Sequence, residues 1–186
     1  MTPYITEDNK VYDIYSRLLQ DRIILISGQI TNDMAATVVS QLLYLSSINT
    51  EDITIYINTP GGSVSDGLAI YDVIQHIQKK CDVSTVCIGM AASMGSILLC
   101  CGTEGKRKIM PHGKIMIHQA SASIDGKCTD LVSSAKDIEH TEEVLTDILA
   151  KHSKMTKTVL KKRMMTDTWY TADQAQKVGL VDEVIK

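Results

Sequence analysis

Short apolar runs alternate with longer amphipathic segments along this chain, and this alternation is the strongest constraint on its fold. The runs have strand length and are rich in Ile, Val or Met; they lie at residues 22–27, 53–58, 83–89 and 114–118. Strands that alternate with helices favour an α/β fold whose strands are largely parallel and whose sites gather at their carboxyl ends. With 186 residues, the chain has room for one domain.

The intervening segments have helical periodicity. Asn32 or Asp33 can cap a first helix, and Ser63 can cap a second. Residues 94–100 are wholly apolar or small, which predicts a short buried helix. Residues 130–151 form the longest periodic segment, and they predict an amphipathic helix. Its apolar face comprises Leu131, Ala135, Ile138, Leu145 and Leu149.

Charge and hydropathy exclude several function classes. The net charge of −3 is too small to favour binding to nucleic acid or to an anionic membrane. The basic runs at 106–108 and 161–163 are interpreted as solvated faces. No apolar run has the length of a membrane span, and the first residues do not resemble a secretory signal, so we expect a cytoplasmic protein.

Cysteine and histidine spacing argues against a metal site. The five cysteines include no C-x-x-C pair, and two of them are adjacent in an apolar run. We therefore expect buried thiols in a reducing compartment. The histidines have no metal-binding spacing, and His140 and His152 are expected on or near the exposed face of the long helix.

Ser93 lies between a predicted strand and a predicted helix, surrounded by small residues. At such a junction free N–H groups point outward and stabilise negative charge, which suits a nucleophile whose tetrahedral intermediate carries an oxyanion. The simpler alternative is that Ser93 only caps the helix, as serine commonly does.

Three further features are candidates for chemistry, each with a plain structural alternative. Residues 59–63 contain two glycines between strand and helix; they can present N–H groups to a ligand or simply form a tight turn. His118 ends an apolar run and can be a base or a core residue. Asp167 is one acid among many. Spacing alone does not join these residues into a site.

Five motifs together resemble the ClpP family, the proteolytic subunits of ATP-dependent Clp serine proteases. They occur in the family's order over nearly the whole chain from Tyr12 onward. They are residues 13–19 (DIYSRLL), 56–62 (YINTPGG), 89–95 (GMAASMG), 116–119 (MIHQ) and 179–182 (GLVD).

The resemblance implies a catalytic triad. Ser93 would be the nucleophile, His118 the general base and Asp167 the acid that orients it, since residues 167–172 are similar to the segment around the family's acid. The backbone N–H groups of Gly62 and Met94 would form the oxyanion hole. No metal or organic cofactor is implied.

The resemblance also implies an architecture for residues 1–186. The expected fold is a single crotonase-like spiral of β-β-α units, with an axial segment and first helix at 1–20 and a helical handle at 119–151. Two stacked heptameric rings would enclose a chamber, and a hexameric AAA+ unfoldase would feed unfolded polypeptide into it.

The sequence departs from the family pattern at four places. Ala120 replaces the usual Pro after His-Gln, and Ala122-Ser123 replaces a Gly pair, whereas Gly126 is retained. The segment before Tyr12 is shorter, so stunted gating loops are expected. His76 stands where an aromatic residue usually lines the unfoldase-docking cleft. About two residues are added near 79–81.

Two alternatives remain beside an active endopeptidase. The chain could be a weakly active or structural ring member in a mixed assembly with a ClpP paralogue. An acyl-CoA enzyme of the crotonase type would share the fold, but such enzymes need no Ser-His-Asp set.

Overall fold

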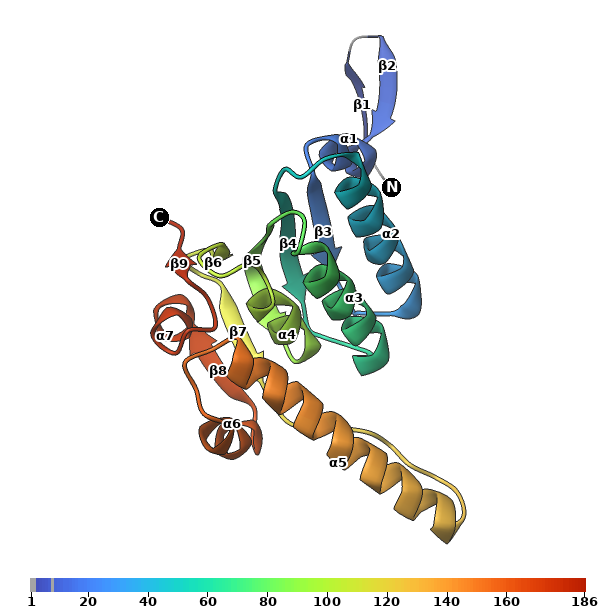
Figure 1. Ribbon diagram of the computed structural model, residues 1–186, viewed down its shortest axis with the longest axis vertical. Helices are drawn as coiled ribbons and strands as arrows, with labels where there is room; N and C mark the ends of the chain where they lie inside the picture. The colour runs from blue at the N-terminus through green and yellow to red at the C-terminus, as the bar shows by residue number, and fades with distance from the viewer. Residues whose placement is uncertain (1–2, 8) are drawn as a thin grey trace.

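The computed structural model describes residues 3–7 and 9–186, and within them one mixed sheet organises the chain (Figure 1). The sheet order is β3-β4-β5-β6-β9, with β7 beside β5 and β8 beside β7. These pairs are parallel apart from β7 with β8, so the predicted α/β fold with a mostly parallel sheet is confirmed. The strands are β3 (Ile23–Ser27), β4 (Ile53–Thr59), β5 (Val83–Ala92), β6 (Arg107–Ile109), β7 (Lys114–Ile117), β8 (Thr168–Thr171) and β9 (Glu183–Val184).

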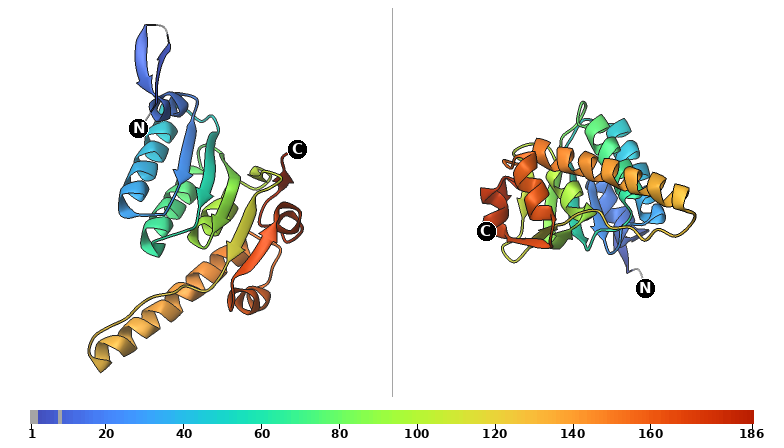
Figure 2. Two further views of the ribbon diagram at one scale, coloured as in Figure 1. Left: turned by 180° about the vertical axis from the view of Figure 1, so that it is seen from behind. Right: turned by 90° about the horizontal axis from the view of Figure 1, so that it is seen from below.

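Helices α2 (Asn32–Ile48), α3 (Val64–Ile77) and α4 (Met94–Cys100) lie on one face of the sheet. Seen from behind, the strands lie in front of these three helices (Figure 2). Side chains alternate accordingly: Ile53, Ile55 and Ile57 are fully buried, whereas Tyr56 is only half-buried. The remaining helices are α1 (Ile14–Gln20), α6 (Lys157–Met164) and α7 (Ala172–Lys177).

The first helix caps differ in part from the prediction. Thr31, and neither Asn32 nor Asp33, caps α2 by accepting a hydrogen bond from the Met34 N–H. Ser63 caps α3 as predicted, and it accepts from the Asp66 N–H. Thr31 was missed because Thr, Asn and Asp stand side by side and all favour that position.

The long helix α5 (Cys128–Lys151) projects beyond the sheet, with residues 119–127 running back along it (Figures 1 and 2). Only its C-terminal half packs on the body, where Leu145, Ile148 and Leu149 are buried. Leu131 and Ala135 of the predicted apolar face are exposed. The periodicity predicted the helix correctly, but half of its apolar face has nothing to pack against among residues 3–7 and 9–186.

At the other end of the molecule, β1 (Tyr4–Glu7) and β2 (Lys10–Asp13) form an antiparallel hairpin beside α1 (Figure 1). The predicted axial segment at 1–20 covers this hairpin and α1, while residues 1, 2 and 8 lie outside the described residues. None of the described helices is long and apolar enough to cross a membrane.

Two expectations about the exposure of side chains were wrong. Arg107, which belongs to a run interpreted as solvated, is only 8% exposed. His152, expected on or near the exposed face of α5, is half-buried and its Nε2 lies 3.1 Å from the Tyr71 hydroxyl. Four of the five cysteines are buried as expected, and Cys128 is exposed.

Candidate active site

The ends of three neighbouring strands bring the candidate residues together. Ser93 follows β5, the Gly61-Gly62 turn follows β4, and His118 follows β7. Because β5 pairs in parallel with both β4 and β7, these three strands end along one edge of the sheet. The sequence placed each of these residues at the end of a strand. The order of the strands in the sheet then brings the residues close to one another.

Ser93 stands at the N-terminus of α4 but does not cap it with its side chain. Its Oγ lies 2.8 Å from Nε2 of His118, at hydrogen-bond distance. The backbone of Ser93 is strained, with φ 54° and ψ −124°. Such a conformation in a residue with a Cβ costs about 1–3 kcal/mol and clusters at functional sites. The capping alternative for the Ser93 side chain is therefore wrong.

Three contacts fix the position of His118. The Ser93 N–H donates to the carbonyl oxygen of Met116 at 2.9 Å, which ties the end of β7 to the serine turn. The Gln119 N–H donates to the carbonyl oxygen of Met164 at 2.8 Å. The ring Nδ1 lies 3.3 Å from Oδ1 of Asp167.

Asp167 is the most loosely held of the three side chains. Its side chain is 64% exposed, and 3.3 Å exceeds the 2.7–2.9 Å common in charge-assisted hydrogen bonds. The structure nevertheless aligns hydroxyl, imidazole and carboxylate in the order that general-base activation of a serine requires.

The glycine turn after β4 packs directly on Ser93. A Cβ on Gly61 would lie 2.7 Å from the Cβ of Ser93, so the turn approaches that closely only because Gly61 has none. The N–H groups of Gly62 and Met94 donate to no acceptor within residues 3–7 and 9–186. Two free donors therefore flank the serine hydroxyl.

Thr59 organises this turn, a role that sequence reasoning missed. Its fully buried hydroxyl donates to the carbonyl oxygen of Gly28 at 2.5 Å and accepts from the Gly61 N–H at 3.1 Å. The signal was present, because threonine immediately before Pro-Gly-Gly can hydrogen-bond to the backbone two residues on.

A small cavity of about 70 Å³ opens beside Ser93 and His118. Apolar side chains from α4, α5 and α6 contribute to its wall, and Gly62 and Met94 also line it. The lining residues are Gly62, Val64, Ser93, Met94, Ser96, Ile97, Ile117, His118, Ala120, Ser121, Leu145, Leu149 and Met164.

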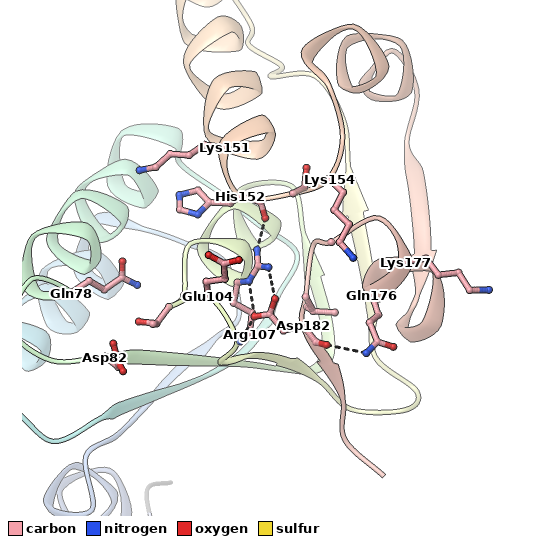
Figure 3. Close-up of a pocket in the computed structure, with 15 residues that line it drawn as sticks. Gln78, Asp82, Glu104, Arg107, Lys151, His152, Lys154, Gln176, Lys177 and Asp182 are labelled. Atoms are coloured by element: carbon pink, nitrogen blue, oxygen red, sulfur yellow. Dashed lines mark hydrogen bonds and ion pairs between the residues drawn. The ribbon is translucent and has the colours of Figure 1, made fainter.

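A second cavity, of about 870 Å³, contains none of the candidate catalytic residues. It lies where the ends of α5 and α7 meet β6, and Figure 3 shows Arg107 pointing between Asp182 and the backbone of His152. The guanidinium binds the carboxylate through Nε–Oδ2 at 2.9 Å and Nη2–Oδ1 at 2.5 Å. This cavity surrounds a structural ion pair and lacks a nucleophile paired with a base.

The family model described as Clp protease matches residues 6–186, which is almost the entire chain. This chain belongs to the Clp protease family. Its ClpP-type fold and its character as a ClpP-like peptidase follow from that membership. Members of the family act as oligomers together with Clp unfoldases.

No group of three or more His, Cys, Asp or Glu side chains within the described part of the chain could hold a metal ion.

Proposed function

We propose that this chain is a serine endopeptidase subunit that cleaves unfolded polypeptides through an acyl-enzyme on Ser93. The observation that carries the proposal is the Ser93 Oγ to His118 Nε2 distance of 2.8 Å, beside two free backbone donors. Membership of the Clp protease family supports it independently.

The proposed mechanism follows from this geometry. His118 Nε2 removes the hydroxyl proton as Ser93 Oγ attacks the scissile carbonyl, and Asp167 stabilises the resulting imidazolium through Nδ1. The N–H groups of Gly62 and Met94 bind the oxyanion, where charge develops. The imidazolium then protonates the leaving amine, and a water molecule activated by His118 hydrolyses the acyl-enzyme.

The cavity beside Ser93 supports a preference for an apolar residue on the acyl side of the cleaved bond. Leu145 and Leu149 line it from α5, while Met94 and Ile97 line it from α4. Its volume of about 70 Å³ favours compact side chains. A charged side chain would lose its hydration there without gaining a partner.

The proposed functional unit is an oligomer of single-domain subunits. Two stacked heptameric rings joined through the handle at 119–151 would cover the exposed apolar side chains of α5, and the segment at 1–20 would lie near the axis. The partners would be an AAA+ unfoldase and, in a mixed ring, a ClpP paralogue. We propose a cytoplasmic location, with no nucleic-acid or membrane partner.

The deciding experiment compares Ser93→Ala with wild type in hydrolysis of a fluorogenic peptide. Removing the nucleophile of such a site lowers kcat by several orders of magnitude, while assembly measured by mass in solution stays intact. A fluorophosphonate should label Ser93 alone, and Ser47→Ala on the exposed side of α2 should behave like wild type. Turnover close to wild type in Ser93→Ala would exclude Ser93 as the nucleophile.

A structural ring member of a mixed ClpP assembly is the second candidate, and His76 is the observation that favours it. This side chain is exposed in the last turn of α3, at the position where the family usually has a cleft aromatic. That difference concerns docking of a partner rather than the chemistry at Ser93.

A further inference from the structure

The segment that follows His118 is held from two sides by hydrogen bonds to its backbone. The Gln119 N–H donates to the carbonyl oxygen of Met164, and the Ala120 N–H donates to Oε2 of Glu142, both at 2.8 Å. The first contact ties the segment to the end of α6, and the second ties it to α5. His118 therefore sits at the start of a backbone segment clamped between two helices.

Only one of the two carboxylate oxygens of Glu142 has a hydrogen-bond partner within the described residues. Its other carboxylate oxygen, Oε1, is buried and has no partner within the described residues. One turn further along α5, the hydroxyl of Thr146 is also buried without a partner, and this side chain is fully enclosed. A buried polar atom without a partner destabilises the folded state, so each such atom calls for an explanation.

These are the two unpartnered buried side-chain polar atoms in the part of the chain that the structure describes, and both are on α5. Positions four residues apart share one face of a helix. Leu145 and Leu149, close to them on α5, line the cavity beside Ser93. Both buried polar atoms without a partner are therefore on the helix that forms one wall of the candidate active site. This is expected where a residue is kept for function although it lowers stability.

Residue 120 explains why an acceptor is needed at this place. Family members usually have proline there, which has no N–H and whose ring restricts φ. Ala120 has an N–H that must be satisfied where it is partly buried, and its backbone is free to move. The carboxylate of Glu142 accepts the hydrogen bond from this N–H, and the same contact restricts the movement of the backbone at Ala120.

We infer that Glu142 is a positioning residue for the proposed hydrolysis, acting through the backbone of Ala120 on the placement of His118. This inference rests on the proposed function. Because Glu142 belongs to α5, the base moves with that helix, and displacement of α5 misaligns His118 from Ser93. Misplacement of a catalytic group by about 1 Å can lower a rate about 100-fold.

The test compares Glu142→Ala and Glu142→Gln with Glu143→Gln, using the fully assembled protein. Glu143 is the matched control, because it is adjacent on α5 but exposed and faces Lys161. We expect Glu142→Ala to lower kcat about 10-fold or more with KM changed less than about 3-fold. Glu142→Gln keeps an oxygen that accepts from the Ala120 N–H, so it should restore most of kcat.

A double-mutant cycle with Ala120→Pro separates positioning from general stability. Proline removes the N–H that Glu142 serves, so adding Glu142→Ala to Ala120→Pro should lower kcat less than about 3-fold further. If the two losses multiply independently, or if Glu142→Ala retains wild-type kcat, Glu142 is not a positioning residue. A lower melting temperature with unchanged kcat would likewise assign it a structural role only.

Two readouts independent of peptide turnover keep this inference distinct from the proposed function. The rate at which a fluorophosphonate labels Ser93 should fall in Glu142→Ala and not in Glu143→Gln. Amide hydrogen exchange in residues 117–121 should become faster in the same variant. A wild-type protein that neither hydrolyses peptides nor labels at Ser93 would refute the proposed function. If hydrogen exchange in residues 117–121 is unchanged in Glu142→Ala, Glu142 does not hold this backbone segment, whatever the rate of peptide hydrolysis.

Discussion

At the scale of residues, the candidate site combines a strained serine with a loosely held acid. Ser93 adopts a positive φ between β5 and α4, and its N–H is anchored to Met116. Asp167 has no comparable constraint, since most of its side chain is exposed and it contacts His118 at 3.3 Å. The proposed nucleophile and base are thus held in place by the fold of one chain, whereas the proposed orienting acid is the least constrained of the three side chains.

Replacing Asp167 with Asn tests this link. The carboxamide preserves shape but cannot stabilise the imidazolium, and it favours the wrong tautomer of His118. We expect the fold to be unchanged and kcat to fall by about 10⁴-fold, the effect seen in well-studied Ser-His-Asp proteases. Steady-state hydrolysis of a fluorogenic peptide measures it. A variant that keeps most of its activity would mean that another acid, or none, orients His118.

His152 makes folding sensitive to acid. Burial, together with the charges of Lys151 and Arg107, lowers its pKa from 6.5 to about 4. The unfolded chain therefore binds more protons between these values, and stability is lost as pH falls from about 6.5 to about 4.

Because His152 is partly exposed, solvent screens its interactions, and the expected loss of unfolding free energy between pH 7 and pH 5 is about 1 kcal/mol. Urea unfolding at the two pH values should show this loss in wild type, and a smaller one in His152→Gln. Parallel pH dependence in the two proteins would contradict the assignment.

The candidate site residues could be proposed from the sequence more completely than the contacts between them. Ser93 and the glycine turn were identified because strand-to-helix junctions with small residues are local features. His118 and Asp167 were assigned to the same site through family resemblance alone, since they are 49 positions apart in the chain. Glu142 carried no signal, because its contact with Ala120 depends on how α5 packs on the sheet.

At the scale of elements, the ion pair between Arg107 and Asp182 links β6 to the segment before β9. The Asp182 carboxylate also accepts from the N–H groups of Gly105 and Arg107. Although burial raises the pKa of Asp182, hydrogen bonds and charge from Arg107 outweigh it and lower that pKa. Stability from this group is present above its unfolded pKa near 3.8 and is lost as pH falls further.

Asp182→Asn should destabilise the protein by about 2 kcal/mol at pH 7, because it leaves the mostly buried Arg107 charge without its counter-ion. Denaturant unfolding at a fixed protein concentration measures this change. The matched control is Glu183→Gln, whose exposed pairing with Lys108 contributes less than about 1 kcal/mol. Equal effects of the two variants would show that burial of the Arg107 pair is unimportant.

The elements themselves were predicted where periodicity is strong and missed where segments are short. The 24-residue α5 and the buried α4 were found, because each repeats one pattern over its whole length. Strands β6, β8 and β9 have three, four and two residues, and they lack the run of consecutive apolar residues that marks the equally short β7. They are defined by their neighbours in the sheet, which sequence alone does not reveal.

At the scale of the whole molecule, several apolar surfaces have no partner within the described residues. The sheet face opposite α2 and α3 is incompletely covered, and the first half of α5 is exposed. Leu43, Tyr44 and Ile48 are each about half exposed on α2. A chain that folds alone seldom leaves so much apolar surface in contact with water, and assembly with further copies would cover it.

The assembled protein should hydrolyse small peptides but couple poorly to an unfoldase unless a paralogue joins the ring. The family resemblance implies that His76 stands where an aromatic residue usually lines the docking cleft, and an exposed imidazole is better hydrated than a phenyl ring. Loss of an aromatic anchor weakens docking by about 2 kcal/mol, and several docking loops that bind at once multiply the loss.

The measurement is ATP-dependent degradation of a tagged folded protein by the homomeric assembly with an unfoldase, with peptide hydrolysis as the control. His76→Tyr should increase this degradation at least about 10-fold, because 1.4 kcal/mol corresponds to a factor of ten in an equilibrium constant. Peptide hydrolysis should remain unchanged, since His76 is on α3 and lines neither the cavity beside Ser93 nor the glycine turn. Efficient degradation by the unmodified homomer would show that His76 does not limit docking.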